Sequence, residues 1–232
     1  MAAEPIPTVL AFDSAGGACS AALLRDGALV ARRWEEMDRG HGEVLMPMIE
    51  TVTADCGYAA LDLICVGTGP GGYTGLRIAI AAARGLALAT GLPVLGVDNL
   101  QLHQQQVCRA HPGRGCAVIL ETRRADFYLQ TFAADGTSLD APSVVTADAV
   151  AERLALRGPG LVLAGDAATR FAETGAASDD AWAGLVQQHA DSAELAMLGA
   201  RRFSEATHTP LSPLYLRPPD VSPPGADRQR LR

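Results

Sequence analysis

Three things are scarce in this sequence of 232 residues: aromatic side chains, positive charge and uninterrupted apolar stretches. Aromatic residues make up 5% of the chain against 48% hydrophobic residues, so the core must be built mainly from small aliphatic side chains. The formal net charge is −7, and the densest arginine cluster (Arg228, Arg230 and Arg232) lies at the C-terminal end. Proteins that bind nucleic acid strongly by themselves carry a basic face that displaces counterions from phosphates. The composition therefore argues against strong direct binding of RNA or DNA.

The sequence also lacks the signs of a membrane or secreted protein. Its most apolar segment, residues 75–97, is interrupted by Arg77, Arg84 and Pro93, which excludes a membrane span. The five cysteines are odd in number and form no CxxC pair, which is typical of reduced, buried thiols. No positively charged segment precedes an apolar run at the N-terminus, so no export signal is expected. These features predict a cytoplasmic protein without membrane contact.

The first half of the chain alternates between strand and helix patterns. Apolar runs predict strands at 8–14, 18–24 and 28–36, and Asp26-Gly27 is a strong signal for a tight hairpin between the last two. From residue 43 the apolar positions recur at helical spacing, with Pro47 expected within about the first turn. A strand at 63–67, a helix at 74–91, a strand at 93–97 and a helix at 99–110 follow. This alternation predicts an α/β fold.

The second half repeats the beginning of the first. Strands are predicted at 116–121 and 126–133, Asp135-Gly136 repeats the turn signal, and residues 161–165 resemble residues 63–67. We interpret this as an internal duplication with a first lobe at 1–112, a second lobe at 113–206 and a cleft between them. A chance similarity of two hairpins is the alternative. Residues 207–232 hold six of the fourteen prolines and are predicted to be a proline-rich tail whose last dozen residues are flexible.

A glycine-rich run from Gly67 to Arg77 lies between a predicted strand and a long helix. Its glycines leave backbone N–H groups unshielded, and Thr74 is a plausible N-cap of a helix whose N-terminus would favour an anion. The candidate phosphate-binding residues are Asp13, Gly69, Gly71, Gly72 and Thr74. The alternative is a close-packed turn that lets the helix press onto the sheet. Spacing alone does not separate the two.

Five segments together resemble the TsaB (YeaZ) family: 11–15 (Ala-Phe-Asp-Ser-Ala), 67–78 (Gly-Thr-Gly-Pro-Gly-Gly-Tyr-Thr-Gly-Leu-Arg-Ile), 85–89, 97–100 and 213–217 (Pro-Leu-Tyr-Leu-Arg). The resemblance implies a two-lobed actin-like ATPase fold, that is, a duplicated RNase H-like fold. It also implies a partnership with TsaD, which transfers a threonylcarbamoyl group to adenosine 37 of tRNAs reading ANN codons. TsaE-type ATPase is implied as a third partner, a homodimer as the form of the chain alone, and tRNA as a ligand only of the complex.

The sequence departs from a TsaD-type enzyme in its histidines. Such an enzyme holds its metal with a His-x-x-x-His pair, because i, i+4 spacing on a helix aims both rings at one ion. Here His41 is followed four residues later by Leu45, and the other histidines form no such pair. We therefore expect no metal site, no catalytic residue and no cofactor in this chain, and the sequence leaves binding of ATP and Mg²⁺ open only for the assembled complex. Asp13 and Asp166 remain strand-end acids that often cap turns.

Apolar residues of the two helices that flank the glycine-rich run can be core, partner interface or a mixture of both. The interface candidates are Leu45, Met48, Ile49, Val52, Ile78 and Ile80. The leading hypothesis is thus a non-catalytic scaffold subunit, a degenerate copy of the transferase. The main alternative is an ATP-binding kinase or hydrolase that uses Asp13, the glycine-rich run and Gly165-Asp166, and a peptidase ranks last because no convincing nucleophile and base are paired.

Overall fold

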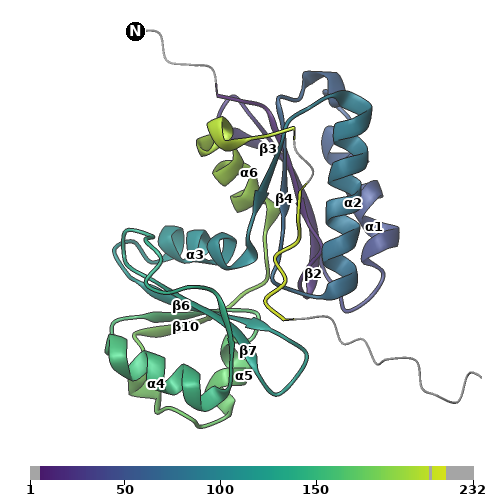
Figure 1. The fold of residues 1–232 in the computed structure, drawn as a ribbon. Helices are drawn as coiled ribbons and strands as arrows, with labels where there is room; N and C mark the ends of the chain where they lie inside the picture. Colours follow the sequence, from purple (N-terminus) through teal and green to yellow (C-terminus); the bar gives the residue numbers. More distant parts are fainter. Residues whose placement is uncertain (1–5, 209–210, 218–232) are drawn as a thin grey trace, which may run out of the picture.

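The computed structural model describes residues 6–208 and 211–217, which form two lobes that each contain a five-stranded β-sheet (Figure 1). The predicted flexibility of the last dozen residues lies outside the described residues. No helix in the described part of the chain is both long and apolar enough to cross a membrane. The five cysteines are free thiols, and three of them are buried (Cys19, Cys65 and Cys116).

The sheet of the first lobe is covered by helices on both faces. Its strands, in the spatial order β3-β2-β1-β4-β5, are β1 (Val9–Asp13), β2 (Ala18–Arg25), β3 (Ala28–Glu36), β4 (Leu63–Gly67) and β5 (Val94–Val97). Leu10 and Phe12 of β1 face the core formed with α1 (His41–Thr53) and α2 (Tyr73–Thr90). Val9 and Ala11 face the opposite core, which includes α6 (Ser192–Arg201). Alternate side chains of β1 are thus buried on both faces, which explains its continuous apolar sequence.

The sheet of the second lobe has the same construction. Its strands, in the spatial order β10-β9-β6-β7-β8, are β6 (Cys116–Glu121), β7 (Phe127–Phe132), β8 (Ser143–Val145), β9 (Val162–Gly165) and β10 (Gly184–Gln187). One face packs on α4 (Ala147–Arg157) and α5 (Ala168–Glu173), and the other packs on α3 (Asn99–Ala110). Short 3₁₀ helices occur at Tyr58–Ala60, Asp179–Ala181 and Phe203–Glu205.

The two sheets share one topology, which confirms the internal duplication. In each sheet the first strand lies between the second, to which it is antiparallel, and the fourth, to which it is parallel. The third strand follows outside the second, and the fifth lies parallel outside the fourth. Asp13 ends β1 and Glu121 ends β6, as the repeat predicts. The α/β class and the two-lobed actin-like fold are confirmed.

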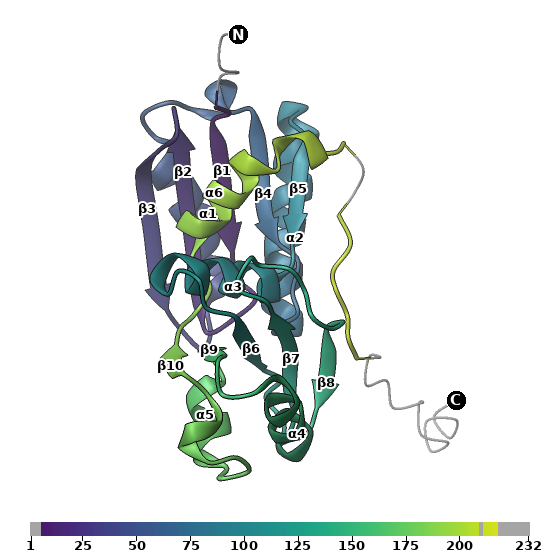
Figure 2. The same cartoon turned by 90° about the vertical axis from the view of Figure 1, so that its left-hand side faces the viewer.

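The third helix of each repeat crosses to the other lobe. Helix α3 packs against β6, β7 and β9 of the second sheet, and α6 packs against β1, β2 and β4 of the first (Figure 2). The predicted lobes at 1–112 and 113–206 follow chain order, whereas the packing exchanges one helix between them. Each lobe therefore depends on the other for the burial of one face of its sheet.

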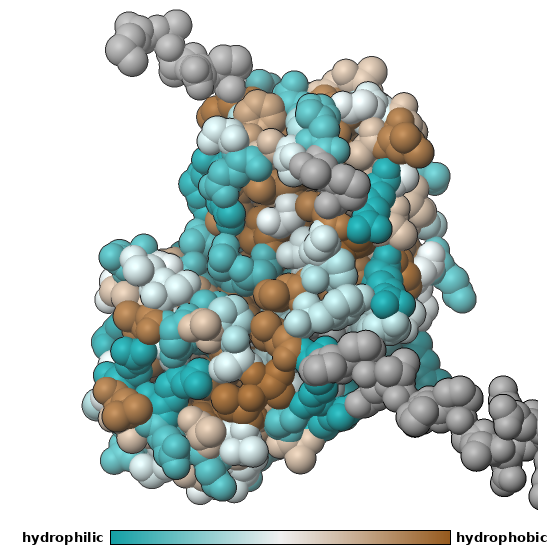
Figure 3. All heavy atoms as spheres, viewed as in Figure 1, coloured by the Kyte–Doolittle hydropathy of each residue, from teal (hydrophilic) through white to brown (hydrophobic). Residues whose placement is uncertain are grey.

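A strap formed by residues 211–217 also connects the lobes. Leu211 is buried in the first core, and the backbone N–H of Leu214 donates to the carbonyl of Thr68 at 2.8 Å. Leu216 packs against the second lobe, where Arg217 forms an ion pair with Asp126. Figure 1 shows this strap in yellow, running past α2 toward the second sheet. Figure 3 shows that some apolar side chains on this face gather near the junction of the lobes, with polar side chains around them.

Three local predictions need correction. Pro47 is the seventh residue of α1, not part of its first turn, and it is tolerated on the exposed side of the helix. Gly72, not Thr74, is the N-cap of α2, and Thr74 makes no capping hydrogen bond. The turn at Asp135-Gly136 does form, but β8 begins only at Ser143 because a longer connection intervenes.

Candidate functional site

A cavity of about 310 Å³ lies between the lobes. The first lobe contributes the β1–β2 loop, the glycine-rich run and the start of α3. The second lobe contributes the ends of β6 and β9. The polar side chains among its lining residues are Asp38, Asn99, His103, Glu121, Arg123, Asp166 and His189.

The buried end of β1 is fixed by an internal hydrogen-bond network. Asp13 has no exposed surface, and its two carboxylate oxygens accept from the backbone N–H of Ala15 (3.1 Å) and from Asn99 Nδ2 (3.1 Å). Asn99 Oδ1 in turn accepts from the N–H of Gly69 at 2.9 Å. Burial raises the pKa of Asp13, and the hydrogen bonds from Asn99 and Ala15 partly offset this rise. Asp13 therefore ties β1, the glycine-rich run and α3 together and does not line the cavity.

Glycines of the run are required because the β1–β2 loop passes directly over them. A Cβ atom built on Gly71 would lie 2.5 Å from the carbonyl oxygen of Ala15, and one on Gly75 would lie 1.9 Å from that of Ser14. The N–H of Gly72 already donates to the Ala15 carbonyl, at 2.6 Å. Real side chains cannot occupy such positions unless the backbone moves. Of the two interpretations of this run, the geometry favours the close-packed turn.

Two histidines, the buried His103 and the partly exposed His189, line the cavity. His103 is 2% exposed, and burial lowers its pKa to about 3, so its ring is neutral. The Nδ1 atoms of His103 and His189 are buried, and no described residue forms a hydrogen bond with either. His189 lies over Gly17, where a Cβ atom would come within 2.7 Å of its ring. Asn99 and His103 are four residues apart on α3, which places them on one helical face toward the cavity.

Acids of the second lobe line the opposite wall. Asp166 follows β9 and accepts a hydrogen bond from the N–H of Glu121 at 2.8 Å. Burial raises the pKa of Asp166 to about 6 despite this hydrogen bond. Glu121 is paired with Arg170 (2.8 Å), whose guanidinium also lies 3.9 Å from the ring centroid of Phe127. The carboxylates are thus engaged mainly with their own lobe.

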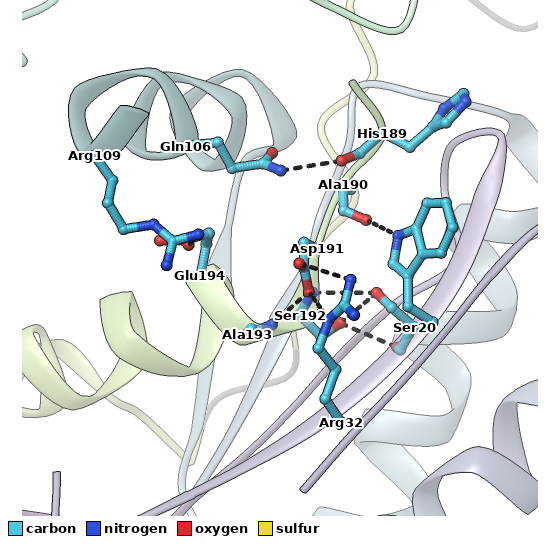
Figure 4. A network of polar contacts seen from close by, with 11 residues as sticks. Ser20, Arg32, Gln106, Arg109, His189, Ala190, Asp191, Ser192, Ala193 and Glu194 are labelled. Atoms are coloured by element: carbon cyan, nitrogen blue, oxygen red, sulfur yellow. Dashed lines mark hydrogen bonds and ion pairs between the residues drawn. The ribbon is translucent and has the colours of Figure 1, made fainter. Parts of the chain in front are cut away.

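The chain returns from the second lobe to the first through residues 188–191, which polar contacts hold in place (Figure 4). Gln106 donates to the carbonyl of His189 at 3.1 Å, and the indole of Trp34 donates to that of Ala190 at 3.2 Å. The hydroxyls of Ser20 and Ser192 are 2.7 Å apart and buried. Two ion pairs complete the network, Arg32–Asp191 at 3.0 Å and Arg109–Glu194 at 2.5 Å. These contacts fix the segment 188–191 between the two lobes.

The residues of the cleft do not suit a nucleoside triphosphate held by this chain alone. The N–H groups of Gly69 and Gly72, which a phosphate would need, already donate to Asn99 and Ala15. Three carboxylates (Asp38, Glu121 and Asp166) line the cavity against one arginine, Arg123, and would repel phosphate oxygens. Among the described residues, no group of three or more His, Cys, Asp or Glu side chains is placed to hold a metal ion.

A second cavity, of about 530 Å³, opens where α1 and α2 begin. Both helices start at a glycine, Gly40 and Gly72, without a side-chain capping bond. Thr74, Tyr73, Arg39 and Arg123 line it together with Asp38 and Glu43.

The predicted phosphate-binding residues are therefore separated by the fold. Gly71 lines the first cavity, Thr74 lines the second and Gly72 lines both, whereas Asp13 and Gly69 line neither. Sequence reasoning missed His103 and the bond between Asn99 and Asp13. Two signals could have found them: Asn99 follows β5 at the carboxyl edge of the sheet, where β1 also ends, and His103 stands one helical turn further on.

The predicted interface residues are mostly core. Leu45, Met48, Ile49, Val52 and Ile80 are between 0% and 8% exposed and pack against the first sheet, and Ile78 is partly buried beside them. The five buried side chains leave almost no surface for a partner while the lobe is folded, whereas Ile78 lines the second cavity. The exposed positions of the same helices are different residues, including Met46, Ala81, Gly85 and Leu88, the last of which is 89% exposed.

Comparisons with known proteins agree with this fold. A family model described as TsaD, tRNA N6-adenosine threonylcarbamoyltransferase, matches residues 34–195. The tRNA threonylcarbamoyladenosine biosynthesis protein TsaB of Escherichia coli (strain K12) is 31% identical over 152 residues, which is 63% of this chain and 65% of that protein. TsaB of Bacillus subtilis (strain 168) is 34% identical over 40% of this chain and 42% of its own length. The alignments thus span less than two thirds of these curated relatives.

Two further relatives are matched over almost their full length. An uncharacterized protein of Mycobacterium tuberculosis (strain ATCC 25618 / H37Rv) is 33% identical over 230 residues, which is 96% of this chain and 98% of that protein. The solved structure of YeaZ from Pseudomonas aeruginosa superimposes with a TM-score of 0.78 at 27% identity, covering 90% of this chain and all of that one. By both sequence and fold, the chain belongs to the TsaB (YeaZ) family, which is related to the TsaD transferases.

Proposed function

We propose that the chain is a non-catalytic scaffold subunit in the synthesis of threonylcarbamoyladenosine at position 37 of ANN-decoding tRNAs. In this role it binds a TsaD-type transferase and a TsaE-type ATPase in the cytoplasm, forms a homodimer when alone, and reaches tRNA only through the complex. The chain alone binds neither nucleotide nor Mg²⁺. One observation supports the non-catalytic part of this proposal most directly. Asp13 is buried at the end of β1, and internal hydrogen bonds occupy both of its carboxylate oxygens.

We assign to the partner the exposed side of α1 around Met46 and the exposed side of α2 from Ala81 to Leu88. Met46 and Pro47 are exposed on α1, and Ala81, Gly85 and Leu88 are exposed on α2. Small residues let a second helix approach closely, and an exposed leucine contributes apolar area that is buried on contact. The same face serves a second copy of the chain when no transferase is present.

Light scattering on a sizing column tests the proposal, using the chain alone and mixed with the TsaD-type protein of its own organism. We expect one shared peak of one-to-one mass, weakened by Met46→Glu or Leu88→Glu. Leu156→Glu is the matched control, because Leu156 is 85% exposed on α4 of the second lobe. Separate peaks for the two native proteins at micromolar concentration would refute the scaffold role.

Calorimetry with ATP and Mg²⁺ distinguishes the scaffold from a kinase or hydrolase that acts alone. We expect no heat of binding from the isolated chain at millimolar nucleotide, since the loop N–H groups and Asp13 are already engaged. Saturable binding, or turnover by the chain alone, would favour the enzyme instead.

A further inference from the structure

An exposed cluster of two tyrosines and an arginine lies beside the second cavity. The rings of Tyr73 and Tyr215 are 6.1 Å apart between centroids and 26° from parallel. The Arg77 guanidinium lies 3.7 Å from the Tyr73 ring centroid, and Arg77 Nε donates to the Tyr215 hydroxyl at 2.9 Å. Tyr73 and Tyr215 nevertheless remain 52% and 45% exposed. The cluster is thus an ordered aromatic surface open to solvent.

The fold holds this cluster in place from both sides. Tyr73 is the first residue of α2, and Arg77 follows one helical turn later on the same face. Tyr215 lies in the strap between Leu214, whose N–H is bonded to Thr68, and Leu216, which packs on the second lobe. These two anchors hold the backbone on either side of Tyr215, whose ring stays exposed.

The cluster is not needed to fasten the strap. Leu211, the Leu214 hydrogen bond, Leu216 and the Arg217–Asp126 pair already do so. By contrast, phenylalanines such as Phe12, Phe127 and Phe132 are fully buried. Rigid, exposed aromatic surface next to a guanidinium is the composition of a binding surface, because such side chains lose little conformational entropy on contact.

The charges around the cluster favour an anionic ligand. Arg77 belongs to the cluster itself, and Arg39 and Arg123 line the cavity that Tyr73 borders. The N-termini of α1 and α2 open into the same cavity and add partial positive charge, while Asp38 and Glu43 are the acids there. The whole chain has a formal net charge of −7, whereas the charge around this cluster is mainly positive.

We propose that Tyr73, Arg77 and Tyr215 form a stacking platform for an unpaired nucleotide of the tRNA, with its phosphates toward Arg39 and Arg123. The inference rests on the proposed function, which brings tRNA to the complex. Aromatic rings and guanidinium planes stack on any base, and single-stranded parts of RNA are the parts that present bases for stacking. One platform contributes modest affinity, which agrees with an acidic chain that binds tRNA only as part of an assembly.

The test measures tRNA affinity of the assembled complex of this chain with its TsaD-type partner. The probe is a fluorescently labelled, unmodified transcript of an ANN-decoding tRNA, titrated at fixed salt and followed by anisotropy. Stacking on an aromatic side chain corresponds to a loss of about 5-fold to 150-fold in affinity per base when the ring is removed. We expect a loss in this range for Tyr73→Leu and Tyr215→Leu, and less than about twofold for Tyr73→Phe, which keeps the ring.

Phe203→Leu is the matched control, because Phe203 is 40% exposed in a 3₁₀ helix outside the cluster. Ultraviolet cross-linking of the native complex to the tRNA gives a second readout that does not depend on any variant folding. We expect cross-linked peptides that contain Tyr73 or Tyr215.

Each other outcome overturns the inference and identifies what failed. Leucine variants that assemble and bind tRNA as the native complex does would refute the platform and leave the scaffold role intact. Leucine variants that fold but no longer co-elute with the transferase would show that the cluster contacts protein instead of RNA. Failure of the native chain to co-elute would overturn the proposed function and, with it, the platform.

Discussion

Replacing Gly75 by alanine tests whether the glycine-rich run is a packing device. Gly75 is the third residue of α2, and a Cβ atom there would lie 1.9 Å from the Ser14 carbonyl oxygen. The hydroxyl of Ser14 also donates to the carbonyl of Gly75, at 2.8 Å. Gly85 of the same helix offers a matched control, because a Cβ atom there meets nothing within 4 Å.

The two alanine substitutions are expected to change the free energy of unfolding in opposite directions. In a helix interior alanine is about 1 kcal/mol more favourable than glycine, so Gly85→Ala should raise the free energy of unfolding by most of that amount. At Gly75 the added methyl group pushes the β1–β2 loop away, at an overpacking cost of about 1–3 kcal/mol or more. Loss of the Ser14 hydrogen bond adds about 1 kcal/mol. We expect Gly75→Ala to lower the free energy of unfolding by about 1–3 kcal/mol, after its helix gain is subtracted.

Urea unfolding measures both effects. With a slope of about 2 kcal/mol per molar urea, the midpoint should fall by about 0.5–1.5 M for Gly75→Ala and rise slightly for Gly85→Ala. Trp34 in β3 reports on the first lobe when Trp182 is replaced by phenylalanine in all proteins, and far-UV circular dichroism checks that the transitions coincide. Equal stabilisation by the two alanines would refute the packing explanation, because the loop would then have room for a side chain.

Three further predictions concern the cleft and the first core. Asn99→Ala leaves Asp13 Oδ2 and the Gly69 N–H without these partners and should lower the free energy of unfolding by about 2–5 kcal/mol, measured by urea unfolding. The pKa of Asp166 rises from 3.8 to about 6 on folding. The contribution of Asp166 to the free energy of unfolding is therefore fully present below about pH 4 and is lost as the pH rises to about 6. Asp166→Asn should therefore gain stability over the native protein at pH 7.5 and lose that advantage near pH 4, and a pH-independent difference would contradict the burial argument. Leu45→Glu should unfold the first lobe in circular dichroism, since Leu45 is 1% exposed, whereas Leu88→Glu should not.

The fold was largely predictable because its signals are local and repeated. Strand and helix periods place most elements within about two residues, and the two strand-end acids reveal the duplication. The exchange of α3 and α6 between lobes was not predictable in this way. Both helices carry an apolar face, and the pattern of one helix does not say which sheet that face covers.

The glycine-rich run shows the same limit at the level of single residues. Spacing identifies a segment in which backbone must come close to something, but phosphate and protein backbone impose the same requirement. The distinction depends on the loop after β1, whose carbonyls at Ser14 and Ala15 occupy the space over Gly75 and Gly71. These contacts join residues about 60 positions apart, and no local pattern records them.

Most of the predicted interface residues lie in the core for a related reason. Helical spacing correctly grouped Leu45, Met48, Ile49 and Val52 on one face of α1, and that face is the core side. A helix that is apolar nearly all round can bury only one side against its own sheet, so the excess has to appear elsewhere. On α2 it appears at Ala81, Gly85 and Leu88, which stay exposed while Leu76, Ala79 and Ile80 are buried. The composition of α2 therefore still argues for a partner, and the residues that would contact it are those outside the buried stripe.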